Sequence, residues 1–401
     1  MNKKKTFNLL LIAQSLSAFG DNAVFSVIMG MLLGLVKTNQ LTLIQFGFTS
    51  AIYANCLFLP YVVFAPILGW FSDRYTKKNV LIYGNLIKAF GCLIGLIGVI
   101  IGKNLMVASY LMIGIGAAVY SPSKYGIIPE LKAEEDLVKA NAAIEMTTIF
   151  SILIGIIGGS LLIDNLGEKN SYFVLTVVFF AAVFFNYLMD ESHIRNTEAV
   201  ITKSIVDFKI SVRNIFTNRY LLIPVLGTAI FWFAASFLKL NLQTWGQEAL
   251  KLSTATSLSL LALWLSLGII VGSFIAGEKY KTGQIRQTWI FGLGMGLLIL
   301  IMAAKYFNYG LVIVELILLG ALGGIFLIPL NAAIQAKADL KNIGKVIAIQ
   351  NFLENGAMLI SSGCFYSLNK AAVSSIFTFI SLGGFLCLIN ILWLRPSLKK
   401  L

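Results

Sequence analysis

The sequence predicts an all-α membrane protein whose twelve transmembrane helices form two six-helix halves. Three observations support this prediction. The 401 residues are 58% hydrophobic and 12% charged, whereas a soluble domain has roughly 25% charged residues. Apolar stretches of about 20 residues, the length that crosses a bilayer, recur along the whole chain. One long polar interval divides them six and six, and no stretch alternates with the period of two that a β-barrel requires.

The apolar stretches are separated by short polar breaks, as expected for successive spans. The first follows the basic start Met1–Lys5 and continues to about Val36 without a small-residue cleavage site, so we predict a retained helix and not a signal peptide. The twelve stretches are centred near Val24, Leu57, Ile94, Gly114, Ile154, Phe179, Phe231, Leu265, Leu297, Leu319, Leu359 and Leu382.

The distribution of charge predicts the orientation. Lys and Arg accumulate in cytoplasmic loops, and with both termini inside, most of the 31 basic residues fall in such loops. The net charge of +13 is spread over many loops, which indicates membrane topology and not nucleic-acid binding. The four cysteines form no CxxC pair, so neither a disulfide framework nor a metal site is predicted.

The longest polar interval divides the chain into an N-terminal bundle (1–189), a cytoplasmic linker (190–219) and a C-terminal bundle (220–401). The linker mixes basic, acidic and apolar residues, so it is either an amphipathic segment on the membrane surface or a simple connector.

An internal repeat supports the two halves. Gly116 precedes Pro122 and Lys124 at the same offsets at which Gly323 precedes Pro329 and Asn331. Two parallel six-helix repeats around a central cavity are the arrangement of major facilitator transporters.

The segment GWFSDRYTKK, between the second and third spans, resembles a loop signature of that superfamily. An aspartate near a neighbouring helix end, with basic residues near phosphate headgroups, would form a conformation-sensitive latch. The alternative is an ordinary basic cytoplasmic loop. The predicted latch consists of Gly69, Asp73, Arg74, Lys77 and Lys78.

Ionisable residues inside spans cost several kcal/mol unless paired or hydrated. Asp21 lies ~21 Å along the first span at 1.5 Å per residue, on one face with Gln14 and Ser17. Such groups either line a charged cavity or pair with one another to hold helices together. We favour the cavity for Asp21 and Glu354, and pairing or snorkelling for Lys88 and Glu315. The predicted substrate-binding or gating residues are Asp21, Lys124, Glu145, Lys239, Gln350, Asn351 and Glu354.

Four segments closely resemble the lysophospholipid transporter family, the bacterial inner-membrane flippases of the major facilitator superfamily. They are AQSLSAFGDNAVFS, GIGAAVYSPSKYGIIPEL, LVKANAAIEMTT and GGIFLIPLNAAIQ with AIQNFLENGAM. The resemblance implies a major facilitator fold and movement of lysophosphatidylethanolamine, with lysophosphatidylglycerol as a second candidate, from the outer to the inner leaflet for reacylation. Lipid entry through a lateral opening is our hypothesis.

The resemblance also implies residue roles. The family's charged and amide positions fall on Asp21, Lys124, Glu145, and Gln350, Asn351 and Glu354. Lys239 stands where the family has an arginine, which keeps the charge but loses bidentate recognition of phosphate. No cofactor, catalytic group or metal is expected. The expected partners are the lysolipid, membrane lipids and a separate lysophospholipid acyltransferase, with the chain acting as a monomer.

Two other functions were considered. The first is a proton-coupled exporter of drugs or small solutes with the same fold, using Asp21 or Glu354 as the coupling carboxylate. The second is a lysolipid acyltransferase, because His193 and Glu198 loosely imitate the H-x-x-x-x-D pair of such enzymes. The rest of an acyltransferase domain is missing around His193, so a solvated loop histidine is the preferred interpretation.

Overall fold

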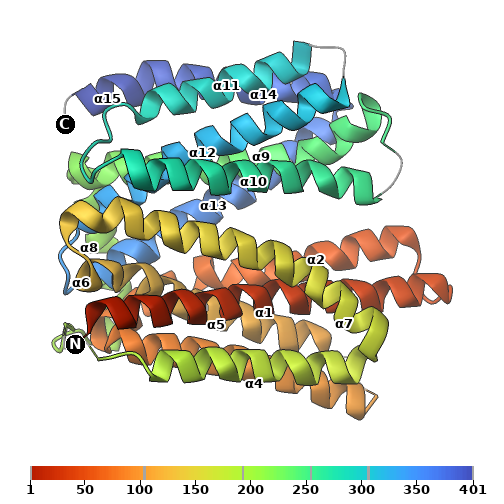
Figure 1. The fold of residues 1–401 in the computed structure, drawn as a ribbon, viewed down its shortest axis with the longest axis horizontal. Coiled ribbons are helices and arrows are strands. Elements are labelled where there is room, and N and C mark those ends of the chain that lie inside the picture. Colours follow the sequence, from red (N-terminus) through yellow and green to blue (C-terminus); the bar gives the residue numbers. More distant parts are fainter. Residues whose placement is uncertain (1, 103–104, 192–193, 253–254, 305–307, 400–401) are drawn as a thin grey trace. The chain divides into compact units, whose positions relative to one another are not determined.

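The computed structural model describes residues 2–102, 105–191, 194–252, 255–304 and 308–399, and every regular element in these ranges is a helix (Figure 1). The all-α prediction is therefore confirmed. The α-helices are α1 (Lys3–Lys37), α2 (Leu43–Val63), α3 (Ala65–Arg74), α4 (Lys77–Ile100), α5 (Met106–Gly126), α6 (Ile128–Leu131), α7 (Leu137–Tyr187), α8 (Ser204–Thr217), α9 (Arg219–Glu248), α10 (Ala255–Lys279), α11 (Thr288–Ala304), α12 (Tyr309–Lys337), α13 (Ile343–Lys370), α14 (Ser375–Ile389) and α15 (Arg395–Lys399).

The described helices account for twelve spans when the bent pair α2 and α3 is counted as one span and the interrupted helix α7 as two. Eight are long and apolar enough to cross a membrane, and a ninth span is the pair α2 and α3, bent by 64°. Helix α7 has 51 residues and holds two spans, because Gly167 (φ 71°, ψ 179°) interrupts it in a conformation that favours glycine. The short apolar α11 and the more polar α13 complete the set.

The bend between α2 and α3 lies within a stretch that the sequence analysis treated as one span. Phe64 separates the two helices, Pro60 lies inside α2, and Pro66 lies in the first turn of α3. Proline cannot donate the backbone hydrogen bond that would continue a helix through this point. As a result, Gly69, Asp73 and Arg74 lie on helix α3 and not in a loop.

The chain divides into two compact units. The first turns of α7 belong to unit 2, and the first two turns of α13 belong to unit 1. The predicted boundaries of the bundles and the linker stay a prediction. Unit 1 comprises Met1–Lys132, Thr147–Ser211 and Asp339–Asn351, and unit 2 comprises Ala133–Met146, Val212–Ala338 and Phe352–Leu401.

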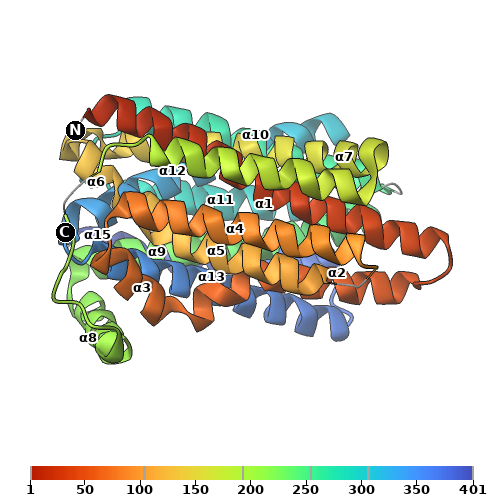
Figure 2. The same cartoon turned by 90° about the horizontal axis from the view of Figure 1, so that it is seen from below.

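In unit 1, α4 and α5 lie side by side (Figure 2), and α2 packs against α5. Gly114 of α5 permits the second contact, because a Cβ there would lie 2.1 Å from the carbonyl oxygen of Cys56. The apolar core of this unit includes Val24, Tyr53, Tyr110 and Phe179, all at most 2% exposed.

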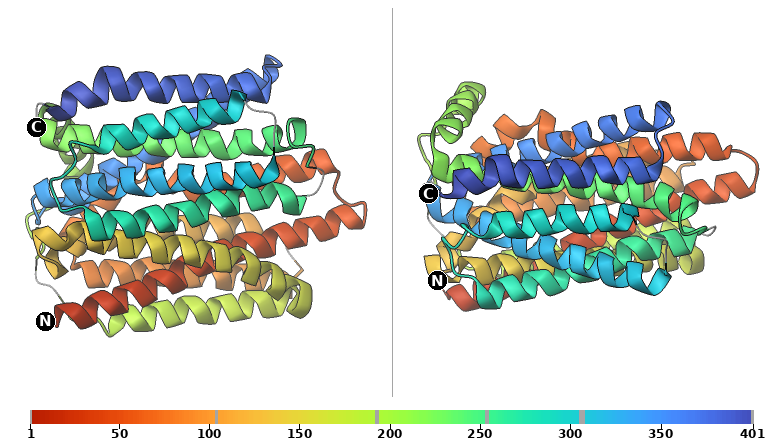
Figure 3. Two further views of the ribbon diagram at one scale, coloured as in Figure 1. Left: turned by 45° about the horizontal axis from the view of Figure 1, so that its top comes forward. Right: turned by 90° about the horizontal axis from the view of Figure 1, so that it is seen from above.

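In unit 2, α10 packs against α12, and α11 lies beside α14 (Figure 3). A Cβ on Gly272 would lie 2.0 Å from the Ala321 oxygen, and one on Gly320 would lie 2.1 Å from the Leu265 oxygen. Because lipid supplies no hydrophobic force between helices, such small residues stabilise packing by close backbone approach.

Gly272→Ala is expected to destabilise the protein, because its methyl group meets backbone and not a flexible side chain. Overpacking of this kind typically costs ~1–3 kcal/mol. The measurement is the midpoint of thermal unfolding in detergent. Gly384→Ala in α14 is the matched control, since nothing lies within 4 Å of its added Cβ. Equal midpoints for both variants would contradict the proposed packing.

Candidate functional site

Asp21 of α1 forms an ion pair with Lys88 of α4 inside unit 1. Lys88 Nζ lies 2.6 Å from Asp21 Oδ2 and donates a hydrogen bond to Ser17 Oγ at 2.8 Å. Ser17 in turn donates to Asn85 Oδ1 at 2.7 Å. We call Ser17, Asp21, Asn85 and Lys88 the Asp21 cluster. It connects two membrane-spanning helices, α1 and α4, through polar groups.

Helical spacing brings these four side chains together. Ser17 and Asp21 are four residues apart and Asn85 and Lys88 are three apart, so each pair lies on one face of its helix. The Lys88 ammonium also lies 5.3 Å from the ring centre of Tyr120 and 5.9 Å from that of Phe179. Aromatic faces stabilise a desolvated cation, and the ammonium is therefore held at a defined position.

The Asp21 carboxylate has acceptor capacity beyond this pair. Its side chain is 15% exposed, whereas that of Lys88 is 2% exposed. Within the described residues, Asp21 Oδ1 accepts no hydrogen bond. A buried acceptor without a donor loses the hydrogen bonds it would make to water. The cluster therefore leaves part of the hydrogen-bonding capacity of this buried oxygen unused within the described residues.

Lys124, Gln350 and Asn351 lie in the same unit as Asp21. Lys124 of α5 is 8% exposed, and its ammonium lies 4.3 Å from the ring centre of Tyr125. The Asn351 amide donates to Ser121 Oγ at 3.0 Å, which connects the start of α13 to α5. Gln350 precedes it and is buried as well.

Glu145, Lys239 and Glu354 belong to unit 2. Glu145 and Glu354 are buried, and Lys239 of α9 is exposed. The start of α7 is anchored in this unit by two reciprocal amide hydrogen bonds, of 2.7 and 3.0 Å, between Asn141 and Gln335 of α12. The predicted substrate residues therefore form two sets, one in each unit.

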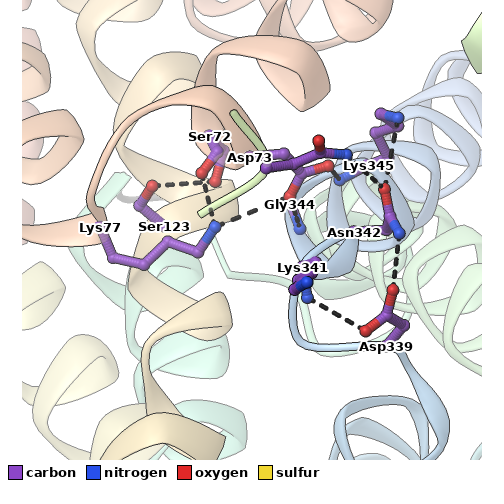
Figure 4. Close-up of polar contacts among 10 residues, drawn as sticks. Ser72, Asp73, Lys77, Ser123, Asp339, Lys341, Asn342, Gly344 and Lys345 are labelled. Atoms are coloured by element: carbon purple, nitrogen blue, oxygen red, sulfur yellow. Dashed lines mark hydrogen bonds and ion pairs between the residues drawn. The ribbon is translucent and has the colours of Figure 1, made fainter. Parts of the chain in front are cut away.

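Asp73 caps the N-terminus of α13, as Figure 4 shows. Its Oδ1 accepts a hydrogen bond from Gly344 N at 2.6 Å, and its Oδ2 accepts one from Lys345 N at 3.1 Å. Backbone N–H groups in the first helical turn have no partner within their helix, and the helix dipole favours a negative charge there. Lys77 Nζ lies 3.6 Å from Asp73 Oδ1, with both side chains fully buried.

The other predicted latch residues surround this cap. Gly69 allows α3 to approach α13, because a Cβ there would lie 3.0 Å from Lys345 Cα. Arg74 donates to the carbonyl oxygen of Thr197, and the Lys78 ammonium lies 5.2 Å from the ring centre of Tyr187.

Sequence reasoning missed two contacts of the site. It favoured pairing for Lys88 but a cavity for Asp21, and did not identify the two as partners, whereas the structure pairs Asp21 with Lys88. The signal was present in the Asn85–Lys88 spacing, which matches the polar face of α1. It also missed the amide pair of Asn141 and Gln335, which joins helices far apart in sequence. His193 lies outside the described residues.

The fold is that of the major facilitator class of membrane transporters. A family model described as Major Facilitator Superfamily matches residues 10–362. Among solved structures, a fucose:proton symporter of E. coli, FucP, has a TM-score of 0.76 at 14% identity and covers 99% of each chain. A bacterial homologue of the iron transporter ferroportin has a TM-score of 0.74 at 17% identity over 98% of each chain. These likenesses show the fold alone.

Curated relatives define the family more closely. The lysophospholipid transporter LplT of Pectobacterium carotovorum subsp. carotovorum (strain PC1) is 31% identical over 93% of this chain and 88% of the relative. The lysophospholipid transporter LplT of Serratia proteamaculans (strain 568) is 32% identical over 90% of this chain and 87% of the relative. The chain belongs to the lysophospholipid transporter family of the major facilitator superfamily.

Lys88→Met is expected to destabilise the protein by ~3–5 kcal/mol, because it leaves the Asp21 charge buried without its partner. The double variant Asp21→Asn with Lys88→Met should recover much of this loss. Thermal unfolding of the two single variants and the double variant measures the coupling.

The matched control for this double-mutant comparison is the exposed ion pair of Lys139 and Glu278. Their side chains are 66% and 51% exposed. Exposed pairs contribute only ~0–1 kcal/mol, so Lys139→Met should have little effect. Similar losses for Lys88→Met and Lys139→Met would show that the Asp21 cluster is not a buried ion pair.

Asp73→Ala is expected to reduce stability by at least the ~0.5–2 kcal/mol of a lost N-cap. Asp73→Asn keeps a side-chain oxygen that can accept one of the two backbone hydrogen bonds, so its loss should be smaller. Hydrogen exchange of the Gly344 and Lys345 amides is the local readout. Unchanged exchange in Asp73→Ala would exclude the cap.

Proposed function

We propose that this protein is a lysophospholipid transporter that moves lysophosphatidylethanolamine from the outer to the inner leaflet of the bacterial inner membrane for reacylation. The observation that carries the proposal is the Asp21 cluster, in which a partly exposed carboxylate within membrane-spanning helices keeps one oxygen without a donor among the described residues. The names of the curated relatives support the lipid class. The proposal places both termini in the cytoplasm.

The headgroup chemistry suits the charged residues of the two units. A phosphoethanolamine headgroup has an ammonium, which donates N–H bonds, and a phosphate, which accepts them. Asp21 would receive the ammonium, while Lys124 of the same unit would bind the phosphate through charge-assisted hydrogen bonds. We propose Lys239, in unit 2, as a further phosphate-binding residue. We also propose Glu145, Gln350, Asn351 and Glu354 as binding or gating residues within their own units.

Transport then follows alternating access, with the headgroup exposed to one leaflet at a time. The single acyl chain stays in lipid and enters laterally, so it requires no dry protein pocket. We propose that the Asp73 cap on α13 is the latch that stabilises one of the two states, because it gives two backbone N–H groups a charged acceptor. Motion of α3 away from α13 would expose these groups.

In this proposal, a separate acyltransferase would reacylate the lysolipid that reaches the inner leaflet. The transporter itself acts as a monomer. The competing function is proton-coupled export of a small solute. The same buried carboxylate could carry a proton, so the choice between the two functions depends on the substrate that is moved. A panel of polar solutes in the assay below separates them.

Asp21→Asn is expected to reduce transport of lysophosphatidylethanolamine about tenfold to hundredfold, because a hydrogen bond to a charged group contributes ~1.5–3 kcal/mol. Lysophosphatidylglycerol has no ammonium, so its transport, normalised to the amount of folded protein, should be affected much less. The measurement is headgroup-resolved transport in proteoliposomes, with and without ion gradients.

Lys239 provides the matched comparison. Lys239→Gln should reduce transport of both lysolipids equally, because the phosphate is common to them, and Lys239→Arg should retain both. Normal transport of lysophosphatidylethanolamine by Asp21→Asn would disprove the assignment of Asp21. Transport of a polar solute but of neither lysolipid by the wild-type protein would disprove the proposed function.

A further inference from the structure

Helix α8, which lies between α7 and α9 in the sequence, exposes apolar side chains on the face that the protein does not cover. Phe208 and Ile215 are buried at 9% and 2% exposure, and Ser204 lies on the same face. A helix with its other side in water would present polar residues there. Instead, four large apolar side chains are 47–60% exposed: Ile205, Val206, Ile210 and Phe216.

The same exposed face is cationic. Lys209 and Arg213 are exposed and lie one turn apart, between the apolar residues in the helical projection at 3.6 residues per turn. Lys203 directly precedes the helix and Arg219 follows it, and Asp207 is the single acid of the helix. Long cationic side chains can direct their charges outward while apolar neighbours insert into a less polar phase.

Long cationic side chains on this face can reach anionic headgroups while the apolar side chains beside them insert more deeply, so the face suits the interface of an anionic bilayer. The chain itself supplies that surface, because α8 is joined at both ends to membrane-spanning helices, α7 and α9. We infer that α8 binds the anionic headgroups of the cytoplasmic leaflet, with Val206 and Ile210 inserted at the boundary between headgroups and acyl chains. The inference rests on the proposed placement of both termini in the cytoplasm.

The linker ahead of α8 contacts the latch. Asn196 N donates to the backbone oxygen of Asp73 at 2.7 Å, and the Asn196 amide donates to Asn342 Oδ1 at 3.2 Å. Arg74 donates to the carbonyl oxygen of Thr197. A membrane-bound α8 would restrain this linker against the end of α3 and the start of α13. Anionic lipid would therefore stabilise the Asp73 cap.

The first test measures the depth of α8 in nanodiscs. A nitroxide label is placed at Ile210→Cys in the full chain, after replacement of the natural cysteines at 56, 92, 364 and 387 by serine or alanine. In discs that contain phosphatidylglycerol, the label should lie ~5–10 Å below the headgroups, as reported by its relative accessibility to oxygen and to a nickel complex. In discs of phosphatidylcholine alone it should move toward water.

Charge variants provide the controls. Lys209→Glu with Arg213→Glu should shift the label to the aqueous phase, while Lys281→Glu with Arg286→Glu makes the same charge change in the loop between α10 and α11 and should not. Lys209→Arg with Arg213→Lys should keep the wild-type depth. Slower hydrogen exchange of Gly344 N in anionic discs, lost in the first variant, is the expected sign of coupling to the latch.

Three outcomes would overturn the inference. One is a label at 210 that is as accessible to water in anionic discs as in zwitterionic discs. Another is an equal response to the two double charge reversals. The third is a label that is immobilised to the same extent in every lipid composition, which would identify a protein as the occupant of this face. None of these readouts uses lysolipid transport, so a failure of the proposed function would leave them unchanged.

Discussion

The ion pair between Asp21 and Lys88 allows helices of a bilayer protein to carry charge at membrane depth. Neither group tolerates a lipid-like surrounding alone, because the loss of hydration costs several kcal/mol for each ion. Ser17 and Asn85 extend the pair with hydrogen bonds, and the aromatic rings beside Lys88 stabilise its ammonium. These polar contacts add to the apolar packing of the two helices, because Val24 of α1 and Ala89 of α4 belong to one core cluster.

A related constraint governs the backbone. The start of a helix has N–H groups without partners, and Asp73 supplies two acceptors to the start of α13. In unit 2, glycines bring α10 and α12 to backbone contact, since dispersion replaces the hydrophobic force between helices in lipid. Water can replace the hydrogen bonds of Asp73 when α3 and α13 separate. Water cannot replace the close packing of α10 against α12 at the glycines. This difference is what a transporter requires of a latch and of a rigid bundle.

The charged residues differ in how many of their hydrogen-bonding atoms have partners. Lys88 has a carboxylate, a hydroxyl and two aromatic faces, whereas Asp21 keeps one oxygen without a donor among the described residues. In the linker, α8 shows the complementary pattern, because its cations and apolar side chains are exposed together. Both features suit a protein whose substrate and solvent are lipids.

The sequence by itself determined the all-helical membrane class and the polar face of α1, because bilayer thickness and helical periodicity act on local composition. It also singled out Asp73, through the spacing of its motif. Only the tertiary structure decided that Lys88 is the partner of Asp21 and that Asp73 caps α13. These contacts join residues 67 and 271 positions apart. A local pattern shows which face of a helix is polar, but the partner depends on which helices pack together.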